Sequence, residues 1–146
     1  MRLITLLHLV LLFVVLLASP AARAASEWQQ VGEGDVGRLS VKTSATHKQG
    51  DGFAVVYRLD FPAPQRNKRG GKDYLSTEIQ ATVFCKDKSI ARYELTAYSG
   101  KDGTGEVVGG FKQSLVETKT EAIAKGGSDE DLWRFLCAGK PKAGKK

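Results

Sequence analysis

The stretch Phe53-Ala-Val-Val-Tyr-Arg-Leu-Asp-Phe61 gives the clearest indication of this protein's fold. Its apolar side chains recur at every second position, while Arg58 and Asp60 fall between them. Successive side chains of a β-strand point to opposite faces of a sheet, so a period of two residues indicates a strand. The stretch therefore predicts a strand with a polar face and an apolar face, the latter formed by Phe53, Val55, Tyr57, Leu59 and Phe61.

The same alternation continues on the C-terminal side of this stretch. Residues 74–85 and 90–98 each predict a strand with one apolar face, and Lys86-Asp87-Lys88 between them predicts a tight turn. The glycine-rich stretch 100–105 leads into a further strand at 106–112. Short links between consecutive strands favour an antiparallel meander with one half-buried face.

The face assigned to each side chain depends on regular alternation, and some segments show a weaker strand pattern. In the strand before the glycine-rich turn, regular alternation places Arg92 on the face opposite Leu95. Weaker strand patterns occur at residues 28–31 and 38–46, and residues 115–123 fit neither a helix nor a strand clearly.

Near the C-terminus the apolar period becomes helical. Ser128 and Asp131 predict a capping box, in which each side chain binds the backbone N–H of the other residue. Gly139 predicts a left-handed end to the helix, and Pro141 prevents its continuation. A helix of about ten residues is marginal alone, so it must pack on the apolar face of the sheet. Its own apolar face consists of Leu132, Trp133, Phe135, Leu136 and Cys137.

Residues 1–24 have the pattern of a secretory signal peptide. Arg2 precedes an apolar run at residues 3–18, and Ala22-Arg23-Ala24 has the small-x-small form that signal peptidases read. The run is shorter than the roughly 18 to 20 residues that span a bilayer as a helix. We therefore expect cleavage after Ala24 or Ala25, with an uncleaved N-terminal anchor as the alternative. In the case of cleavage, we expect a product that is exported to the periplasm or out of the cell and has no transmembrane span.

The positive charge of the chain lies mostly outside the expected folded part. The formal net charge is +6, but of the 22 Lys and Arg residues two lie in residues 1–24 and four in residues 140–146. The remaining 16 basic residues face 16 acidic ones. We expect one domain at residues 25–139 and a basic disordered tail at residues 140–146. A neutral body excludes the broad positive field of a specific nucleic-acid-binding domain.

The two cysteines, Cys85 and Cys137, are far apart in the sequence. In an exported chain such a pair is most simply a disulfide. In the chain-entropy model, closing this loop stabilises the fold by about 4 kcal/mol. Two buried free thiols are the alternative. A metal site lacks ligands, because His47 is the one histidine that follows the signal segment.

Several weak motifs follow one another along the chain in a distinctive order. They are Trp28 and Val31 at the start, a long strand ending in Asp60, Tyr74-Leu-Ser76 leading to Cys85, a hairpin with Tyr98 and Gly105-Glu-Val-Val, and a Gly-Ser-acid helix closing on Cys137. This order resembles the surface-adhesin protein E family of Gram-negative bacteria over essentially all of the chain after residue 24.

The resemblance implies an α+β, mainly β fold: a single antiparallel sheet of about six strands with one C-terminal helix packed on its concave face. It also implies that the Cys85–Cys137 disulfide ties this helix to the sheet. A non-enzymatic binding role follows as well, because the founding member is an outer-membrane lipoprotein that binds host extracellular-matrix and serum proteins. A lipoprotein needs a cysteine at its cleavage site, and residues 19–25 contain none. We therefore expect an exported protein that is not a lipoprotein.

A basic cluster lies in the predicted loop at residues 62–73. Its members are Arg66, Lys68, Arg69 and Lys72. Four cations so close together predict a contact for an anionic partner, such as a sulfated glycan, a lipopolysaccharide phosphate or an acidic protein surface. The alternative is a solvated loop without a ligand.

The residue inventory favours a binding protein over an enzyme. His47 has no nucleophile motif near it, and the glycines at residues 100–105 precede a strand, whereas a phosphate-binding loop precedes a helix. We therefore expect no catalytic residue, no cofactor and no metal.

Phe84, Phe111 and Trp133 form either an aromatic binding strip or part of the core. The rival function is a small periplasmic inhibitor, for example of lysozyme, although such an inhibitor of a basic enzyme should present acidic groups.

Overall fold

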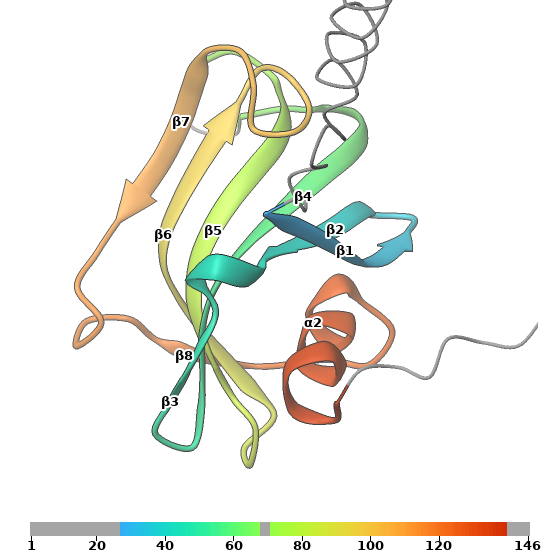
Figure 1. Cartoon of the computed structure of the whole chain (residues 1–146). Coiled ribbons are helices and arrows are strands. Elements are labelled where there is room, and N and C mark those ends of the chain that lie inside the picture. Colours follow the sequence, from blue (N-terminus) through green and yellow to red (C-terminus); the bar gives the residue numbers. More distant parts are fainter. Residues whose placement is uncertain (1–26, 68–70, 140–146) are drawn as a thin grey trace, which may run out of the picture.

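The computed structural model describes residues 27–67 and 71–139, so the predicted signal peptide and basic tail lie outside the described residues (Figure 1). This part of the chain forms strands and one α-helix in the order β1 (Trp28–Gly34), β2 (Gly37–Lys42), a 3₁₀ turn (Thr43–Ala45), β3 (His47–Gln49), β4 (Gly52–Gln65), β5 (Tyr74–Phe84), β6 (Ser89–Tyr98), β7 (Val107–Lys112), β8 (Thr120–Ala122) and α2 (Ser128–Cys137).

The strands form one antiparallel sheet. Its main path has the order β1-β2-β4-β5-β6-β7, while the short strand β3 pairs with β4 and the short strand β8 pairs with β6. The predicted fold class and the main path of six strands are therefore confirmed. The ambiguous stretch at 115–123 contributes β8, whose three residues pair with Ser89–Ala91 of β6.

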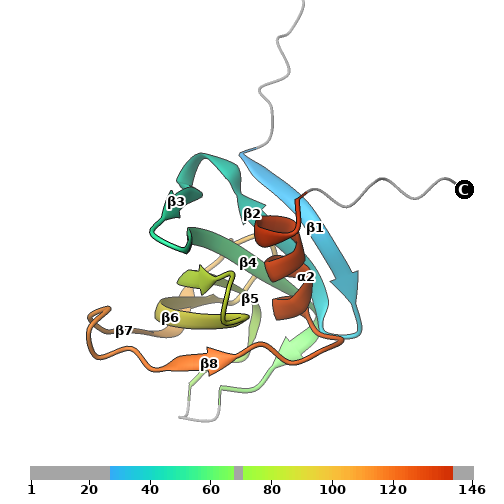
Figure 2. The same cartoon turned by 90° about the horizontal axis from the view of Figure 1, so that it is seen from below.

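Helix α2 lies within the curve of the sheet, as the view from below shows (Figure 2). Leu132 of the helix is fully buried against apolar side chains of the central strands. Burial of a leucine side chain contributes roughly 1.5–3 kcal/mol, which a short helix needs in order to be stable. The core on this face comprises Leu39, Val41, Val55, Tyr57, Ile79, Ala81, Val83, Ile90, Ile123 and Leu132.

The disulfide predicted from the two cysteines is present. Cys85 and Cys137 are bonded, with their Cα atoms 5.5 Å apart and their positions separated by 52 in sequence. Beside this bond, the indole N–H of Trp133 donates a hydrogen bond of 3.3 Å to the carbonyl oxygen of Cys85. The C-terminal end of α2 is therefore fixed to the β5–β6 turn by one covalent and one polar contact.

The predicted capping box at the start of α2 is wrong. Gly127 is the N-cap, it has no side-chain partner, and Ser128 is already the first helical residue. The carboxylate of Glu130 instead accepts a 2.7 Å hydrogen bond from the backbone N–H of Gly126. An acidic side chain still binds a free N–H at the helix start, but the carboxylate belongs to Glu130 instead of Asp131 and the N–H to Gly126 instead of Ser128. Gly139 follows the helix with φ of +78°, as predicted.

The regular alternation predicted for β6 is also wrong. The register between β5 and β6 shifts where Gln80 pairs with Glu94 and the next residue, Ala81, pairs with Arg92. This β-bulge inserts Tyr93 as an extra residue and reverses the faces of the side chains that follow. Arg92 therefore shares the concave face with Leu95, and its Nε donates a 2.9 Å hydrogen bond to the Tyr57 hydroxyl.

The predicted loop at 62–73 is shorter than expected, because β4 continues to Gln65. Pairing with β5 is interrupted between Asp60 and Gln65, which pairs with Tyr74. Pro62 and Pro64 lie in this interruption, and proline is tolerated in a strand where no ladder hydrogen bond is needed. The connection between β4 and β5 thus begins only at residue 66.

The disulfide yields the first testable prediction. The double variant C85S/C137S should have a free energy of unfolding lower by about 2–4 kcal/mol, because the unfolded chain regains the entropy of a 52-residue loop. Urea denaturation followed by circular dichroism measures this difference. Reduction of the wild-type protein serves as the control and should lower stability by the same amount. Equal stability of the variant and the oxidised protein would contradict the prediction.

The start of α2 yields a prediction about pH. Hydrogen bonds from Lys88 and from the backbone of Gly126 hold the pKa of Glu130 at about 2, below its ordinary value of 4.5. Because the folded-state pKa is depressed, the stabilisation is complete above pH 4.5 and is lost as the pH falls toward 2. The variant Glu130→Gln should therefore be less stable than wild type at neutral pH and should lose less stability on acidification. Urea midpoints measured from neutral to acidic pH test this, and parallel pH profiles of the two proteins would refute it.

Candidate binding surface

The polar face of β4 is covered, in contrast to the half-buried sheet that the sequence predicts. Arg58 and Asp60 are only 7% and 5% exposed. The connection between β6 and β7, residues 99–106, folds back over this convex face of the sheet and brings Asp102 onto both side chains. Buried charges are stable only when they are paired and hydrogen-bonded, and these are.

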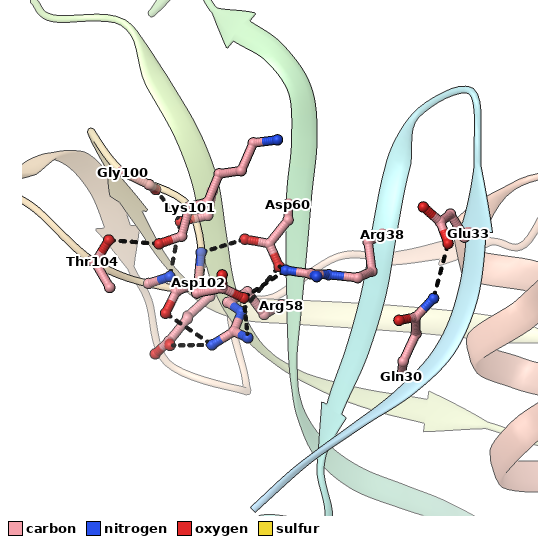
Figure 3. Close-up of polar contacts among 12 residues, drawn as sticks. Gln30, Glu33, Arg38, Arg58, Asp60, Gly100, Lys101, Asp102 and Thr104 are labelled. Atoms are coloured by element: carbon pink, nitrogen blue, oxygen red, sulfur yellow. Dashed lines mark hydrogen bonds and ion pairs between the residues drawn. The ribbon is translucent and has the colours of Figure 1, made fainter. Parts of the chain in front are cut away.

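We call Arg38, Arg58, Asp60 and Asp102 the charge cluster (Figure 3). The Asp102 carboxylate lies 2.6 Å from Nη2 of Arg38 and 3.0 Å from Nη2 of Arg58. The Asp60 carboxylate lies 3.2 Å from Arg38 and 3.3 Å from Nε of Arg58. The hydrogen bond to Asp60 also raises the pKa of Arg38. Two cations and two anions thus neutralise one another beneath the β6–β7 connection.

Backbone contacts hold the β6–β7 connection in the same place. The backbone N–H of Asp102 donates a 2.5 Å hydrogen bond to Asp60. The hydroxyl of Ser76 on β5 donates to the carbonyl of Gly100 at 2.6 Å and accepts from the N–H of Gly103 at 3.1 Å. Gly103 has φ of +68°, and a Cβ there would come within 2.5 Å of the Glu78 side chain, so the turn requires glycine.

The N-terminal strand joins the cluster through an aromatic contact. The guanidinium of Arg58 lies over the ring of Trp28, 4.4 Å from its centroid. Cation–π contacts of this kind contribute about 0.5–2 kcal/mol. Arg58 therefore connects β1, β4 and the connection that leads into β7. In this way the cluster fixes where β7 begins.

A groove lies on the concave face beside β7. Its floor and walls come from β6, β7 and the first residues after β4, and it encloses about 270 Å³. We call it the β7 groove. It is lined by Arg66, Asn67, Tyr74, Leu95, Ala97, Gly109, Gly110 and Phe111. The amide of Asn67 donates to the carbonyl of Val108 at 3.3 Å, which holds the β4–β5 connection against β7. Helix α2 covers the part of this concave face near β1 and leaves the part beside β7 open (Figure 1).

The structure places two of the four residues of the predicted basic cluster. Arg66 borders the β7 groove, its side chain is 87% exposed, and the carboxylate of Asp73 lies 3.9 Å away. Lys72 forms an ion pair with Glu106. Lys68 and Arg69 lie outside the described residues. Arg66 is thus the described member of the basic cluster that faces a groove.

The acidic residues at the start of α2 form ion pairs with the sheet, a role that sequence reasoning missed. Asp129 lies 2.5 Å from the guanidinium of Arg92, and Glu130 lies 2.9 Å from Lys88. The bulge in β6 makes the first of these pairs possible, because it turns Arg92 toward the helix. The charge cluster was also missed by sequence reasoning. Arg58 and Asp60 are neighbours on one face of β4, but Arg38 lies 22 residues before Asp60 and Asp102 lies 44 residues after Arg58, and no local pattern connects these three segments.

The other candidate residues do not come together. His47 is exposed on β3, and within residues 27–67 and 71–139 no group of three His, Cys, Asp or Glu is placed to hold a metal ion. Trp133 packs against the core, whereas Phe111 is 39% exposed at the β7 groove. The two aromatics therefore do not form one strip. Of the described helices, none has both the length and the apolar character needed to cross a membrane.

These features define a class of small domain: one curved antiparallel sheet, a helix held in its curve by a disulfide, and a groove beside an edge strand of the described sheet. The family model of surface-adhesin protein E matches residues 28–138. The chain belongs to this family, which confirms the resemblance found in the order of its motifs.

Solved structures support the same fold. The crystal structure of protein E from non-typeable Haemophilus influenzae matches with a TM-score of 0.54 and 9% identity, covering 82% of this chain and 81% of that one. A second crystal form of Haemophilus influenzae protein E matches with a TM-score of 0.58 and 11% identity, covering 85% and 97%. No curated protein sequence matches this chain. At this identity the solved structures establish the fold alone.

The charge cluster gives a stability prediction with an internal control. Asp60→Asn removes the most buried carboxylate of the cluster, whose side chain is 3% exposed. Arg58, which is 9% exposed, keeps the more exposed Asp102 and Glu78 as carboxylate partners, so the free energy of unfolding should fall by about 3–5 kcal/mol. Asp51→Asn removes a carboxylate from the exposed pair with Lys86 and should change it by less than about 1 kcal/mol. Urea denaturation of both variants measures the two effects, and similar values for both would contradict the proposed importance of the cluster.

Proposed function

We propose that this protein is an exported, non-enzymatic binding module that attaches to a host or envelope macromolecule. The observation that carries the proposal is the match to the surface-adhesin protein E model over nearly the whole described part of the chain. The proposal includes removal of residues 1–24 as a signal peptide, a binding domain at residues 25–139 and a basic tail at residues 140–146. Without a cysteine at residues 19–25, the product is soluble in the periplasm or outside the cell and carries no lipid.

The architecture supports attachment through a fixed surface. The disulfide and the ion pairs of α2 fix one side of the sheet, and the charge cluster fixes the β6–β7 connection. The β7 groove and Arg66 beside it then lie on a rigid scaffold. A rigid surface loses little conformational entropy on binding, which favours affinity. We assign the anionic contact to Arg66, Lys68, Arg69 and Lys72.

Binding assays test this function directly. The chain beginning at Ala25 should bind at least one member of an immobilised panel of extracellular-matrix proteins, serum proteins and sulfated glycans. If the basic cluster makes the contact, affinity should fall steeply as salt rises through about 0.15 M, because the Debye length there is only about 8 Å. The variant R66A/K68A should bind more weakly than K48A/K125A, a control that removes two exposed lysines elsewhere.

One outcome would contradict the proposed function, and another would contradict only its assigned contact. Absence of binding across the panel together with inhibition of lysozyme would favour the rival inhibitor. Equal affinity of R66A/K68A and K48A/K125A would show that the basic cluster is not the contact, even if the module binds.

Export has its own test. Protein purified from its native envelope should have an intact mass that begins at Ala25 or Ser26. It should gain two alkyl groups only after reduction, because both thiols are in the Cys85–Cys137 bond. A mass that retains Met1, or thiols that alkylate without reduction, would contradict export as a cleaved, oxidised protein.

A further inference from the structure

Exposed apolar side chains gather at one edge of the sheet. Among the described residues, five large apolar side chains are exposed, and four of them lie on β7 or in the turn that follows it. These are Val107 at 65%, Phe111 at 39%, Leu115 at 49% and Val116 at 97%. Scattered exposed apolar residues are normal in soluble proteins, but a group along one strand indicates an interaction surface.

The strand beneath these side chains is an edge. In the described sheet β7 pairs with β6 on one side, and no described strand pairs with its other side. The backbone N–H of Gln113 donates to the carbonyl of Tyr93 on β6 at 2.9 Å. Because the main-chain groups of an antiparallel strand alternate in direction, Gly109 and Phe111 also face β6, and Gly110 and Lys112 face away. These outward N–H and C=O groups have the spacing that a further strand requires.

The β7 groove opens beside the same edge. Leu95 and Ala97 lie on its floor, and Gly109 and Gly110 leave its β7 side without side chains. Gly110 cannot be replaced easily, since a Cβ there would come within 2.2 Å of the carbonyl oxygen of Leu95. Glycine at this position therefore lets β7 lie close to β6, and it leaves the groove open to side chains of an incoming strand. The alternate side chains of that strand would reach the groove.

The lining of the groove is complementary to one kind of charge. Among the described residues that line it, only Arg66 is charged and none is acidic. The Asp73 carboxylate, 3.9 Å from Nε of Arg66, lies outside this lining. An apolar floor with a single cation fits an apolar side chain accompanied by a carboxylate. A lipid or fatty acid would satisfy this chemistry but would leave the outward main-chain groups of Gly110 and Lys112 without partners. A polypeptide strand satisfies both.

We propose that β7 is the docking edge for an extended segment of a partner protein. The segment pairs with the outward main-chain groups of Gly110 and Lys112, inserts an apolar side chain into the β7 groove and places an Asp or Glu beside Arg66. This inference rests on the proposed binding function and specifies its partner class and mode of attachment.

A library of random hexapeptides displayed on phage provides the probe. Selection on the chain beginning at Ala25 should enrich peptides with apolar residues at alternate positions and at least one acidic residue. In a synthetic copy of an enriched peptide, N-methylation of alternate amides should abolish binding, while methylation of the intervening amides should be tolerated, since only one edge of the peptide pairs with β7. On binding, hydrogen exchange should slow at the amides of Gly110 and Lys112.

Two proline variants separate the two edges of the sheet. Lys112→Pro removes an outward N–H from β7, and Gln30→Pro does the same on β1, the opposite edge. We expect a loss of affinity of about tenfold or more for Lys112→Pro and no change for Gln30→Pro, as the loss of one or two main-chain hydrogen bonds predicts. Arg66→Glu should weaken binding of the acidic peptide. A peptide with Lys in place of its acid should bind Arg66→Glu more tightly than it binds the wild-type protein.

The outcomes distinguish this inference from the proposed function. No enrichment, loss of the alternating methylation pattern, or equal affinity of the two proline variants would overturn docking at β7. Should Lys112→Pro fail to fold, the methylation pattern on the wild-type protein decides. If a macromolecule from the matrix panel binds Lys112→Pro as well as wild type, the binding module stands and only the β7 assignment fails. If the protein binds neither the panel nor any peptide, both proposals fail.

Discussion

The guanidinium of Arg58 is the group on which the placement of β1, the β6–β7 connection and β7 depends. It lies on the central strand β4, almost fully buried, and it contacts the ring of Trp28, the carboxylate of Asp60 and that of Asp102. A buried cation without partners is strongly unfavourable, so these contacts stabilise Arg58 in its buried position. Through them the N-terminal strand and the β6–β7 connection are fixed to the convex face of the sheet. The position of β7, and with it the groove on the opposite face, follows from this arrangement.

The two faces of the sheet are closed by different means. On the convex side a loop covers charged residues, and its contacts are directional hydrogen bonds and ion pairs. On the concave side a short helix covers the apolar core, and its contacts are hydrophobic burial, a disulfide and two ion pairs at its start. The helix is too short to cover the whole concave face. The part beside β7 therefore stays open and offers an apolar floor bordered by Arg66.

Membership of the surface-adhesin protein E family is accompanied by an identity of only 9–11% to the protein E structures of Haemophilus influenzae. A fold can persist at such an identity because its requirements are few: alternating strands, an amphipathic helix and two cysteines whose Cα atoms come within bonding range. Binding surfaces are built from exposed side chains, which those requirements do not constrain. The groove and edge described for this chain are therefore properties of its own residues.

The sequence by itself determined the main strands, the C-terminal helix with its end at Gly139, and the pairing of Cys85 with Cys137. These features depend on local periodicity, on backbone conformation, or on there being only two cysteines to pair. Only the tertiary structure decided that the polar face of β4 is buried, that Arg92 faces the helix, and that Arg66 borders a groove beside β7. Alternation records the polarity of a face but does not show whether a loop 42 residues away in sequence will cover it. One inserted residue, Tyr93, likewise reverses the faces of a strand without leaving a pattern in the sequence.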